Sequence, residues 1–596
     1  MFFVPAFLLV AAIPLLSDRL AKPALLLSAV LSLALFLNTL LYQQWTLASY
    51  FTLLSALLWF CISLYSLSAE NACRKHAILL PLSYASMLLI MWARDALSFL
   101  VGWEVMTIAS YFSIRDERPA YAFLAFGELS ALLVTVGFAA GIATTGSVLI
   151  DSWAYSGYWW LVFLLASLGF AVKMEIWPFH IWAPSAYSSS PSNFSALMSS
   201  CLTLMGVYGI LRLLSVATPP EWVATVMLVL GAVTAVYGAL HAATSERVKE
   251  LPAYSTIEND GIMFVLLGAY IVASNSVNSD AAFALVAVLF YAFFHSTSKA
   301  LLLLTVGDGR FGPKVRKAAV AFAGCVAAFS LAAIPPMPGF AAEWMALETL
   351  FQSFNLHTPL KLLVVLTGAL VALAAGISAI SMSKVAVYSF LSGSSSGRDG
   401  KDKGEVAGEA DVFEKLSLLI LSAAVLFAGI LPQYILKYVS APVSRITGYK
   451  GDFLGGLLMI PKGMLIVSGK GFGCISPTVL ALFLLGISAA VFIVFRLSLK
   501  GVRFDEPWNG GEESENYTPE AYSMILRLTL KSFYRTRELV CGVLWCDLVE
   551  TLYVRASRMF TKFCDFIRVT LMNGSVGLYV LYILVAMLAL LIYALL

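Results

Sequence analysis

The sequence has few charged residues for its length and no closely paired cysteines. Only 12% of its 596 residues are Asp, Glu, Lys or Arg, and the formal net charge is +3. Charges this sparse, confined to short segments, do not make a surface for nucleic acid. The eight cysteines include no CxxC pair, which argues against a zinc site, an iron–sulfur cluster or a redox dithiol. We therefore expect no metal and no cofactor in this chain.

Apolar sequence, by contrast, is abundant. Hydrophobic residues make up 60% of the chain and the mean hydropathy is +0.86, which predicts an all-α polytopic membrane protein without a large soluble domain. The apolar segment 2–16 has no preceding basic region and no small-residue cleavage site, so it predicts a retained first helix. Stretches of about 20 apolar residues predict about 16 transmembrane helices, two of them broken. Their ranges are 2–16, 24–43, 50–68, 77–93, 97–114, 122–145, 159–182, 194–213, 222–244, 253–273, 281–306, 318–353, 362–390, 412–432, 476–498 and 574–596.

Basic residues gather in the segments that follow odd-numbered helices. Arg74 and Lys75 follow the third predicted helix, and Arg247 and Lys249 follow the ninth. The positive-inside rule then makes these loops cytoplasmic and places both termini outside. Residues 433–475 break the pattern because several basic residues lie there. This segment is expected to be a long loop, or to contain a short re-entrant piece.

Two segments are not predicted to span the membrane. Residues 391–411 are rich in Gly, Ser and charge, which predicts a flexible cytoplasmic loop. Residues 519–572 mix apolar and charged residues at helical spacing, which predicts an amphipathic helix on the cytoplasmic side. The expected parts are N-terminal helices in 1–75, a core in 76–390, the loop 391–411, further helices in 412–500, the amphipathic segment in 501–573 and a final helix in 574–596.

A lysine inside an apolar helix is the first candidate for function. Lys173 follows an uncharged run that starts at Trp159, and Pro178 comes five residues later. A charge near mid-membrane costs about 2.5–3.5 kcal/mol on insertion scales, and such residues usually mark ion pathways. Pro178 is expected to break the helix, and irregular backbone at this depth must be covered by protein or water. The alternative is a lysine that reaches the interface from a helix end.

Glu104 is the natural partner of Lys173. It lies in a helix with no other charge after Asp95, and a carboxylate in hydrocarbon needs a cation or water nearby. The alternative is a static ion pair that only stabilises packing. Glu175 stands two residues after Lys173, on another face of a continuous helix, and receives no role.

A second group of polar residues lies further along the chain. His295 and Lys299 are four residues apart, so they share one helix face with Ser and Thr between them. Such a stripe suits water and proton transfer. A cluster of helix-breaking prolines follows, with Glu343 about one turn beyond it. These prolines are Pro335, Pro336 and Pro338.

Three weaker candidates lie near expected helix ends. Glu258, with Asp260 beside it, is expected where the tenth helix begins, near the cytoplasmic surface. A solvated helix end is the strong alternative for Asp260. Lys384 is expected near the end of the thirteenth helix, where it could reach the interface.

These motifs resemble the antiporter-like subunits of respiratory complex I, Mrp-type sodium/proton antiporters and energy-converting hydrogenases. The resemblance runs from Lys173 through PFHIWAPSAY, SALMS and GVYGILR, and is joined by GWE, AYSTIEN, HSTSKALLLL and PPMPGFAAEW in the family's order. It implies antiporter-like inverted repeats and translocation of protons or sodium within a redox-driven complex. It also implies that Glu104 and Lys173 act as a couple, that Glu343 ends the ion path, and that 519–572 is a lateral helix strapping neighbouring subunits together.

Within this family the sequence motifs are similar to those of the large membrane subunit of formate hydrogenlyase-type nickel–iron hydrogenases. STIEN, the glutamate in PGFAAEW and the C-terminal extension with EPWNGG carry that likeness. It implies a prokaryotic cell membrane, other membrane subunits, and peripheral hydrogenase and iron–sulfur subunits as partners. A Mrp-type exchanger subunit, a complex I pumping subunit and a transport-inactive membrane anchor are the alternatives.

One position departs from the family. The resemblance implies a lysine where this chain has Leu204, and Thr203 beside it cannot replace a titrating group. Protons that still cross must pass by water near Thr203, Ser199 and Ser200, or by a route through His295 and Lys299. We therefore expect this subunit to conduct weakly, or to couple conformationally while another subunit does the pumping.

Overall fold

A computed structural model describes most of the chain. The described residues are 2–41, 45–68, 72–245, 247–276, 278–306, 318–356, 358–391, 411–449, 466–467, 474–498, 553–559, 561–562 and 565. The chain divides into two units, Met1–Ser523 and Met524–Leu596. In the second unit the described residues are short helical stretches within 553–565. All candidate site residues lie in the first unit.

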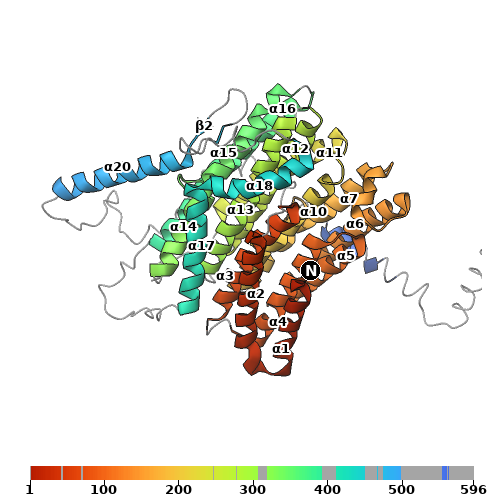
Figure 1. The fold of residues 1–596 in the computed structure, drawn as a ribbon, viewed down its shortest axis with the longest axis horizontal. Helices are drawn as coiled ribbons and strands as arrows, with labels where there is room; N and C mark the ends of the chain where they lie inside the picture. The colour runs from red at the N-terminus through yellow and green to blue at the C-terminus, as the bar shows by residue number, and fades with distance from the viewer. Residues whose placement is uncertain are drawn as a thin grey trace, which may run out of the picture. The chain divides into compact units, whose positions relative to one another are not determined.

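The first unit is built from apolar helices (Figure 1). Twelve of the described helices are long and apolar enough to cross a membrane, and three shorter apolar helices accompany them. The predicted class, an all-α polytopic membrane protein, is confirmed. The helices up to the first break are α1 (Phe3–Leu16), α2 (Ala21–Leu41), α3 (Leu47–Ser66), α4 (Arg74–Trp92), α5 (Ala96–Ser113), α6 (Glu117–Thr145) and α7 (Trp159–Lys173).

The remaining helices follow in the predicted order. They are α8 (Trp182–Ser189), α9 (Ser192–Leu197), α10 (Thr203–Leu214), α11 (Glu221–Thr244), α12 (Glu250–Ser274), α13 (Asn278–Thr305), α14 (Ala318–Leu331), α15 (Pro338–Phe351), α16 (Lys361–Val385), α17 (Val412–Ile430), α18 (Pro432–Thr447) and α20 (Pro477–Ser498). The short π-helical turn η4 (Met198–Leu202) joins α9 to α10 in one continuous span. Each of the first fifteen predicted ranges overlaps a helix, and the sixteenth, 574–596, lies outside the described residues.

Of the two expectations for 433–475, an uninterrupted loop is wrong in its first part, and a re-entrant piece stays a prediction. α18 occupies Pro432–Thr447 and runs crosswise to α13 and α17 in Figure 1. Leu436, Val439 and Val443 are buried on one side of α18 while Lys437 is exposed on the other. Its apolar face is therefore too narrow to be found as an apolar run. After α18, the two-residue strands β1 (Ile466–Val467) and β2 (Cys474–Ile475) pair antiparallel.

The interior is formed by α12 and α13, whose apolar windows are buried completely, as is that of α9 to α10. Few polar groups can be tolerated there unless they meet other polar groups. Tyr291 of α13 donates a hydrogen bond to Asn259 Oδ1 of α12 at 2.9 Å. Lys299 of α13 donates from Nζ to the Pro252 carbonyl of α12 at 3.0 Å. Four of the candidate residues thus lie on the two central helices, namely Glu258, Asp260, His295 and Lys299.

Outside the membrane-spanning segments, Asp95 fixes the start of α5. Its Oδ1 accepts a hydrogen bond from the Ser98 backbone N–H at 2.8 Å. That bond lowers the pKa of the Asp95 carboxyl, because it stabilises the ionised form. α5 therefore begins at Ala96, which sets the position of Glu104 along the helix.

The predicted cytoplasmic loop and the predicted lateral helix stay predictions. Residues 392–410 lie outside the described part of the chain, and so do most residues of the 519–572 segment.

Candidate functional site

Two of the predicted helix breaks are present. α7 ends at Lys173, and the chain continues through an irregular segment with Pro178 to α8. α14 ends at Leu331, and α15 begins at Pro338. Pro335 and Pro336 lie between the two, and both interruptions fall in the ranges where the sequence predicts broken helices.

The backbone follows the same path in both breaks. Each residue of the second break stands 158 positions after its counterpart, as Ala333 does after Glu175, and these two have positive φ angles of 51° and 57°. The same four N–H to carbonyl hydrogen bonds occur in each, a pattern that closes the end of a helix. They are Met174 to Phe170, Glu175 to Val172, Ile176 to Ala171 and Phe179 to Ile176, and then Ala332 to Ala328, Ala333 to Ser330, Ile334 to Phe329 and Met337 to Ile334.

Lys173 lies inside the bundle at the end of α7, with 1% of its surface exposed. Its ammonium lies 4.8 Å from the centre of the Phe123 ring of α6, a cation–π distance. Among the described residues, none hydrogen-bonds to Lys173 Nζ. A lysine reaching the interface is therefore ruled out, because both its stem and its charge are buried.

Two carboxylates act electrostatically on Lys173, Glu104 of α5 and Glu128 of α6. Glu104 is partly exposed and Glu128 is exposed on the surface of this chain. No ion pair within 4.0 Å joins Lys173 to Glu104 in the described structure. Lys173 of α7 therefore interacts electrostatically with Glu104 of α5, as the predicted couple requires. The functional role of this couple stays a prediction. Glu128 was not found by sequence reasoning, although it is a charge in an apolar helix.

His295 and Lys299 are buried in α13, with exposed fractions of 1% and 0%. The charges of Glu258, Glu175 and Asp260 all act on the Lys299 ammonium. Glu343, partly buried in α15, acts in turn on Glu258. We call Glu175, Glu258, Asp260, His295 and Lys299 the central group.

The predicted setting of Glu258 and Asp260 near the membrane surface is wrong. α12 begins at Glu250, so Asp260 lies ten residues, or about 15 Å, inside the helix. Both side chains are buried, at 1% and 0% exposed. Asp260 Oδ1 lies 4.0 Å from His295 Nε2. A solvated helix end is therefore excluded for both residues.

Glu175 completes the central group from the first break. Its side chain is fully buried, and Tyr187 of α8 donates a hydrogen bond from its hydroxyl to Glu175 Oε1. Tyr187 also interacts with the hydroxyl of Ser199 in η4, and Ser199 Oγ is 2.8 Å from Thr256 Oγ1 of α12. A polar chain therefore crosses from α8 to α12.

Leu204 and Thr203 stand beside this polar chain without joining it. Leu204 is 1% exposed in an apolar surrounding. The Thr203 hydroxyl donates back to the Ser199 carbonyl at 2.9 Å, and Ser200 donates to the Ala196 carbonyl at 2.6 Å. These bonds stay within one helical span, so Thr203 and Ser200 are occupied by their own backbone.

Lys384 is buried rather than extended to the interface. It is 4% exposed and donates from Nζ to the Ser245 carbonyl at 2.9 Å. Lys249 makes a similar bond from Nζ to the Ser190 carbonyl at 2.7 Å. Both lysines tie segments between helices together, which is a structural role the sequence did not indicate.

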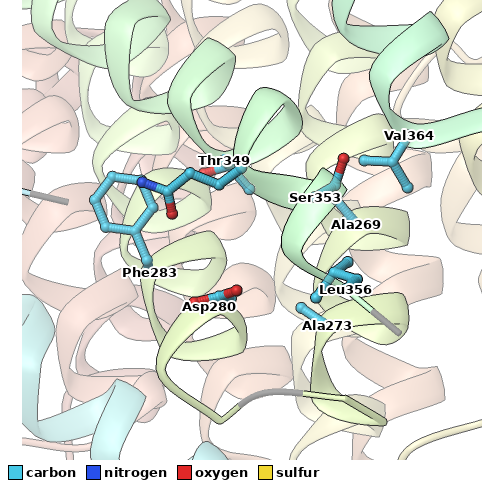
Figure 2. Close-up of a pocket in the computed structure, with 9 residues that line it drawn as sticks. Ala269, Ala273, Asp280, Phe283, Thr349, Ser353, Leu356 and Val364 are labelled. Carbon is cyan, nitrogen blue, oxygen red and sulfur yellow. The ribbon is translucent and has the colours of Figure 1, made fainter. Parts of the chain in front are cut away.

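A small pocket lies where α12, α13, α15 and α16 meet (Figure 2). Asp280, Thr349, Gln352 and Ser353 give it polar walls among apolar residues. Thr349 lies in α15, as Glu343 does, and Gln352 directly follows α15. In the described ranges, no three His, Cys, Asp or Glu side chains gather as a metal site would require.

The sequence of the core matches a known family model. Residues 93–372 match the transmembrane region of the NADH:quinone oxidoreductase and Mrp antiporter family. The core of the chain, residues 93–372, belongs to this family of antiporter-like membrane subunits. The matched region contains both helix breaks and every residue of the central group.

Relatives of this antiporter-like subunit come from several kinds of complex. It is 29% identical to hydrogenase-4 component B of Escherichia coli over 342 residues, which cover 51% of this chain and 50% of that protein. It is 28% identical to formate hydrogenlyase subunit 3 of Escherichia coli over 370 residues, covering 58% and 59%. The antiporter-like subunit thus matches only about half to three fifths of the length of these relatives.

Solved structures share the fold. A chain of an archaeal membrane-bound sulfane sulfur reductase superposes with a TM-score of 0.77 and 20% identity, covering 99% of both chains. A chain of the Mrp complex from a Dietzia species superposes with a TM-score of 0.62 and 18% identity, covering 75% of this chain and 96% of that one. At these identities the likeness concerns the antiporter-like fold alone.

Proposed function

We propose that this antiporter-like subunit translocates protons within a redox-driven membrane complex and contains no redox centre itself. The observation that carries the proposal is the central group, three carboxylates, a histidine and a lysine buried between α12, α13 and the first break. One ammonium among several buried carboxylates is costly to hold in a single charge state, so the group is suited to take up and release protons. Sodium prefers oxygen ligands, whereas a protonated lysine only donates hydrogen bonds. The lysine therefore favours protons over sodium as the ion.

The route that we propose begins at Glu104 and Lys173 and ends at Glu343. Lys173 ends α7, and Glu175 of the central group lies two residues further in the same break. Lys299 and Glu258 then lead to Glu343, which follows the second break. Irregular backbone at membrane depth is tolerated where it lines a polar path, as at the half-helices of many transporters.

The recurring backbone of the two breaks supports an inverted repeat. α4 to α10 form five spans around the first break, and α11 to α16 form five spans around the second. An odd number of spans places two successive repeats in opposite orientations across the membrane. In this proposal each repeat supplies one broken helix, and the central group lies where the repeats meet.

A hydrogenase of the formate hydrogenlyase type is the complex that we propose. The matches to hydrogenase-4 component B and formate hydrogenlyase subunit 3 support this assignment. The partners would be other membrane subunits, with nickel–iron hydrogenase and iron–sulfur subunits at the membrane surface. A sulfur-reducing complex is the second candidate, because the likeness to the sulfane sulfur reductase chain extends over 99% of both chains. In both cases the chain lies in a prokaryotic cell membrane, with both termini outside.

Purification in mild detergent tests the proposal. The whole complex is isolated through this chain, its subunits are identified by mass spectrometry, and it is placed in sealed vesicles with its electron donor and acceptor. We expect nickel–iron subunits and redox-driven proton movement that a protonophore abolishes. Movement that a sodium ionophore abolishes instead would make sodium the ion. Isolation of the chain without redox subunits, together with exchange of sodium for protons, would support a Mrp-type exchanger.

A further inference from the structure

We infer that Glu175 and Tyr187 are the proton link that replaces the lysine missing at Leu204. This inference rests on the proposed function and names two transport residues to which the family resemblance gives no role. Sequence spacing assigned Glu175 to another helix face, but the helix ends at Lys173 and the chain turns there. Glu175 therefore does not follow the helical spacing and lies in the break itself.

Glu175 occupies a position that is unfavourable both for its backbone conformation and for the solvation of its carboxyl group. Its φ of 57° lies in the left-handed region, which residues other than glycine rarely adopt. Its carboxyl is fully buried, and in the described structure no group hydrogen-bonds to its Oε2. A buried carboxyl oxygen without a partner is unusual and needs an explanation in water, an ion or function. One oxygen is thus fixed by Tyr187, and the other is left to exchange a proton.

Tyr187 connects Glu175 to the next helices. Its hydroxyl is fully buried between Glu175 and the hydroxyl of Ser199, and Ser199 Oγ lies 2.8 Å from Thr256 Oγ1. Ser199 also borders His295 through its backbone. Hydroxyl groups both donate and accept, so this series can pass a proton without any of them remaining charged.

The far end of the link is the pair Asp260 and His295. In the parts of the chain that the structure describes, neither oxygen of Asp260 and neither ring nitrogen of His295 has a hydrogen-bond partner. Asp260 acts electrostatically on Tyr187, and Glu175 acts on Asp260. Lys299 acts on Glu175 and Asp260 alike. A charge that changes on Glu175 is therefore felt at Asp260 and at Lys299.

The step balances without a redox change. The Lys173 ammonium breaks one N–H bond, and the Glu175 carboxylate forms one O–H bond. Glu175 then breaks that O–H bond, and the Asp260 carboxylate forms one, while the Tyr187 and Ser199 hydroxyls between them each lose one O–H hydrogen and gain another. No electron moves. The chain returns to its starting state when Asp260 has released the proton towards Glu343 and Lys173 is protonated again from the Glu104 side.

The test compares near-isosteric variants in the purified complex in sealed vesicles. Tyr187→Phe removes one hydroxyl, and Glu175→Gln removes the charge at constant size. Each is scored by protons moved per redox turnover, by redox turnover itself and by the thermal stability of the complex. Tyr84→Phe serves as the matched control, because Tyr84 is buried at 0% exposed, and its hydroxyl contacts Ser63 at 3.2 Å, outside the central group. Lys299→Ala serves as the positive control for transport through the central group.

We expect both variants to lower protons per turnover at least about tenfold while redox turnover and stability stay near those of the unchanged complex. Adding Leu204→Lys to Tyr187→Phe should restore part of the lost pumping. If Lys299→Ala abolishes pumping but Glu175→Gln and Tyr187→Phe do not affect it, this link is wrong and the proposed function stands. If Lys299→Ala also leaves pumping intact, the proposed function fails instead. If both isosteric variants lose thermal stability to the same extent as they lose pumping, the hydrogen bond between Tyr187 and Glu175 is structural. That result would overturn the inference.

Discussion

Asp260 and His295 face each other in the interior of the protein, with Oδ1 4.0 Å from Nε2 and both side chains buried. Each comes from one of the two central helices, α12 and α13. A carboxylate and an imidazole at this distance interact strongly when water is excluded. The gain or loss of a proton by either residue therefore changes the electrostatic energy of the other.

Asp260→Asn should lower protons moved per redox turnover by at least about tenfold, equivalent to about 1.4 kcal/mol. The amide keeps the shape of the carboxyl and removes the negative charge that acts on His295, Tyr187 and Lys299. Asp18→Asn is the control, because Asp18 is 77% exposed in a surface ion pair with Arg74, and such pairs contribute little. Equal pumping by the two variants would show that Asp260 only fills space.

Glu104→Gln should reduce redox-driven pumping by the whole complex, because Lys173 then loses one of the two carboxylates that act on it. The measurement is protons moved per turnover in vesicles. Glu128→Gln is the matched variant, since Glu128 also acts on Lys173 but is exposed. We expect a smaller loss for Glu128→Gln. Unchanged pumping in Glu104→Gln would mean that its couple with Lys173 is structural or absent.

Much of this site could be predicted from the sequence because its parts interrupt apolar runs. Lys173, His295 and Lys299 are ionisable residues in apolar helices. Pro178 and Pro335 indicate where helices are interrupted. Glu175 was missed because its spacing from Lys173 was interpreted on a continuous helix. Asp260 was placed too near the membrane surface because α12 starts at Glu250, three residues before the first residue of the predicted helix.

Other features leave no such signal. Tyr187 has no charge, so only the fold reveals its bond to Glu175. α18 alternates polar and apolar residues over 16 positions and is too polar to be recognised as a span. The two breaks share a backbone hydrogen-bond pattern, but few residues are identical at the matched positions. The repeat therefore cannot be seen in the sequence. Fold class and helix order therefore follow from hydropathy, whereas contacts between distant helices do not.

Gly339→Ala should destabilise the protein by about 1–3 kcal/mol, the cost of overpacking a core. A Cβ at Gly339 would lie 1.9 Å from the Ser330 carbonyl oxygen, where the second break packs against the end of α14. Gly376→Ala in α16 is the control, because a Cβ there meets nothing within 4 Å. Thermal unfolding of the purified complex in detergent provides the comparison. Equal unfolding temperatures for the two variants would show that the break adjusts freely.

Deletion from Thr518 onward should loosen assembly of the complex more than it changes ion affinity. The reason is the predicted lateral helix in 519–572, where about 50 residues at 1.5 Å each would reach about 75 Å and so contact a neighbouring subunit. Native gel mobility and ion dependence of turnover are measured on the same membranes. A deleted chain that assembles fully but has altered ion affinity would contradict the strapping role.

The most direct test of the account is the number of protons moved per redox turnover when Lys299 is replaced by alanine. Lys299 is the cation shared by Glu175, Glu258 and Asp260, so its loss should stop pumping while electron transfer continues. Lys22→Ala, which removes an exposed lysine at the start of α2, controls for the change of charge. We predict that Lys22→Ala pumps normally and that Lys299→Ala pumps at least about tenfold less per turnover. Normal pumping by Lys299→Ala would contradict transport through the central group.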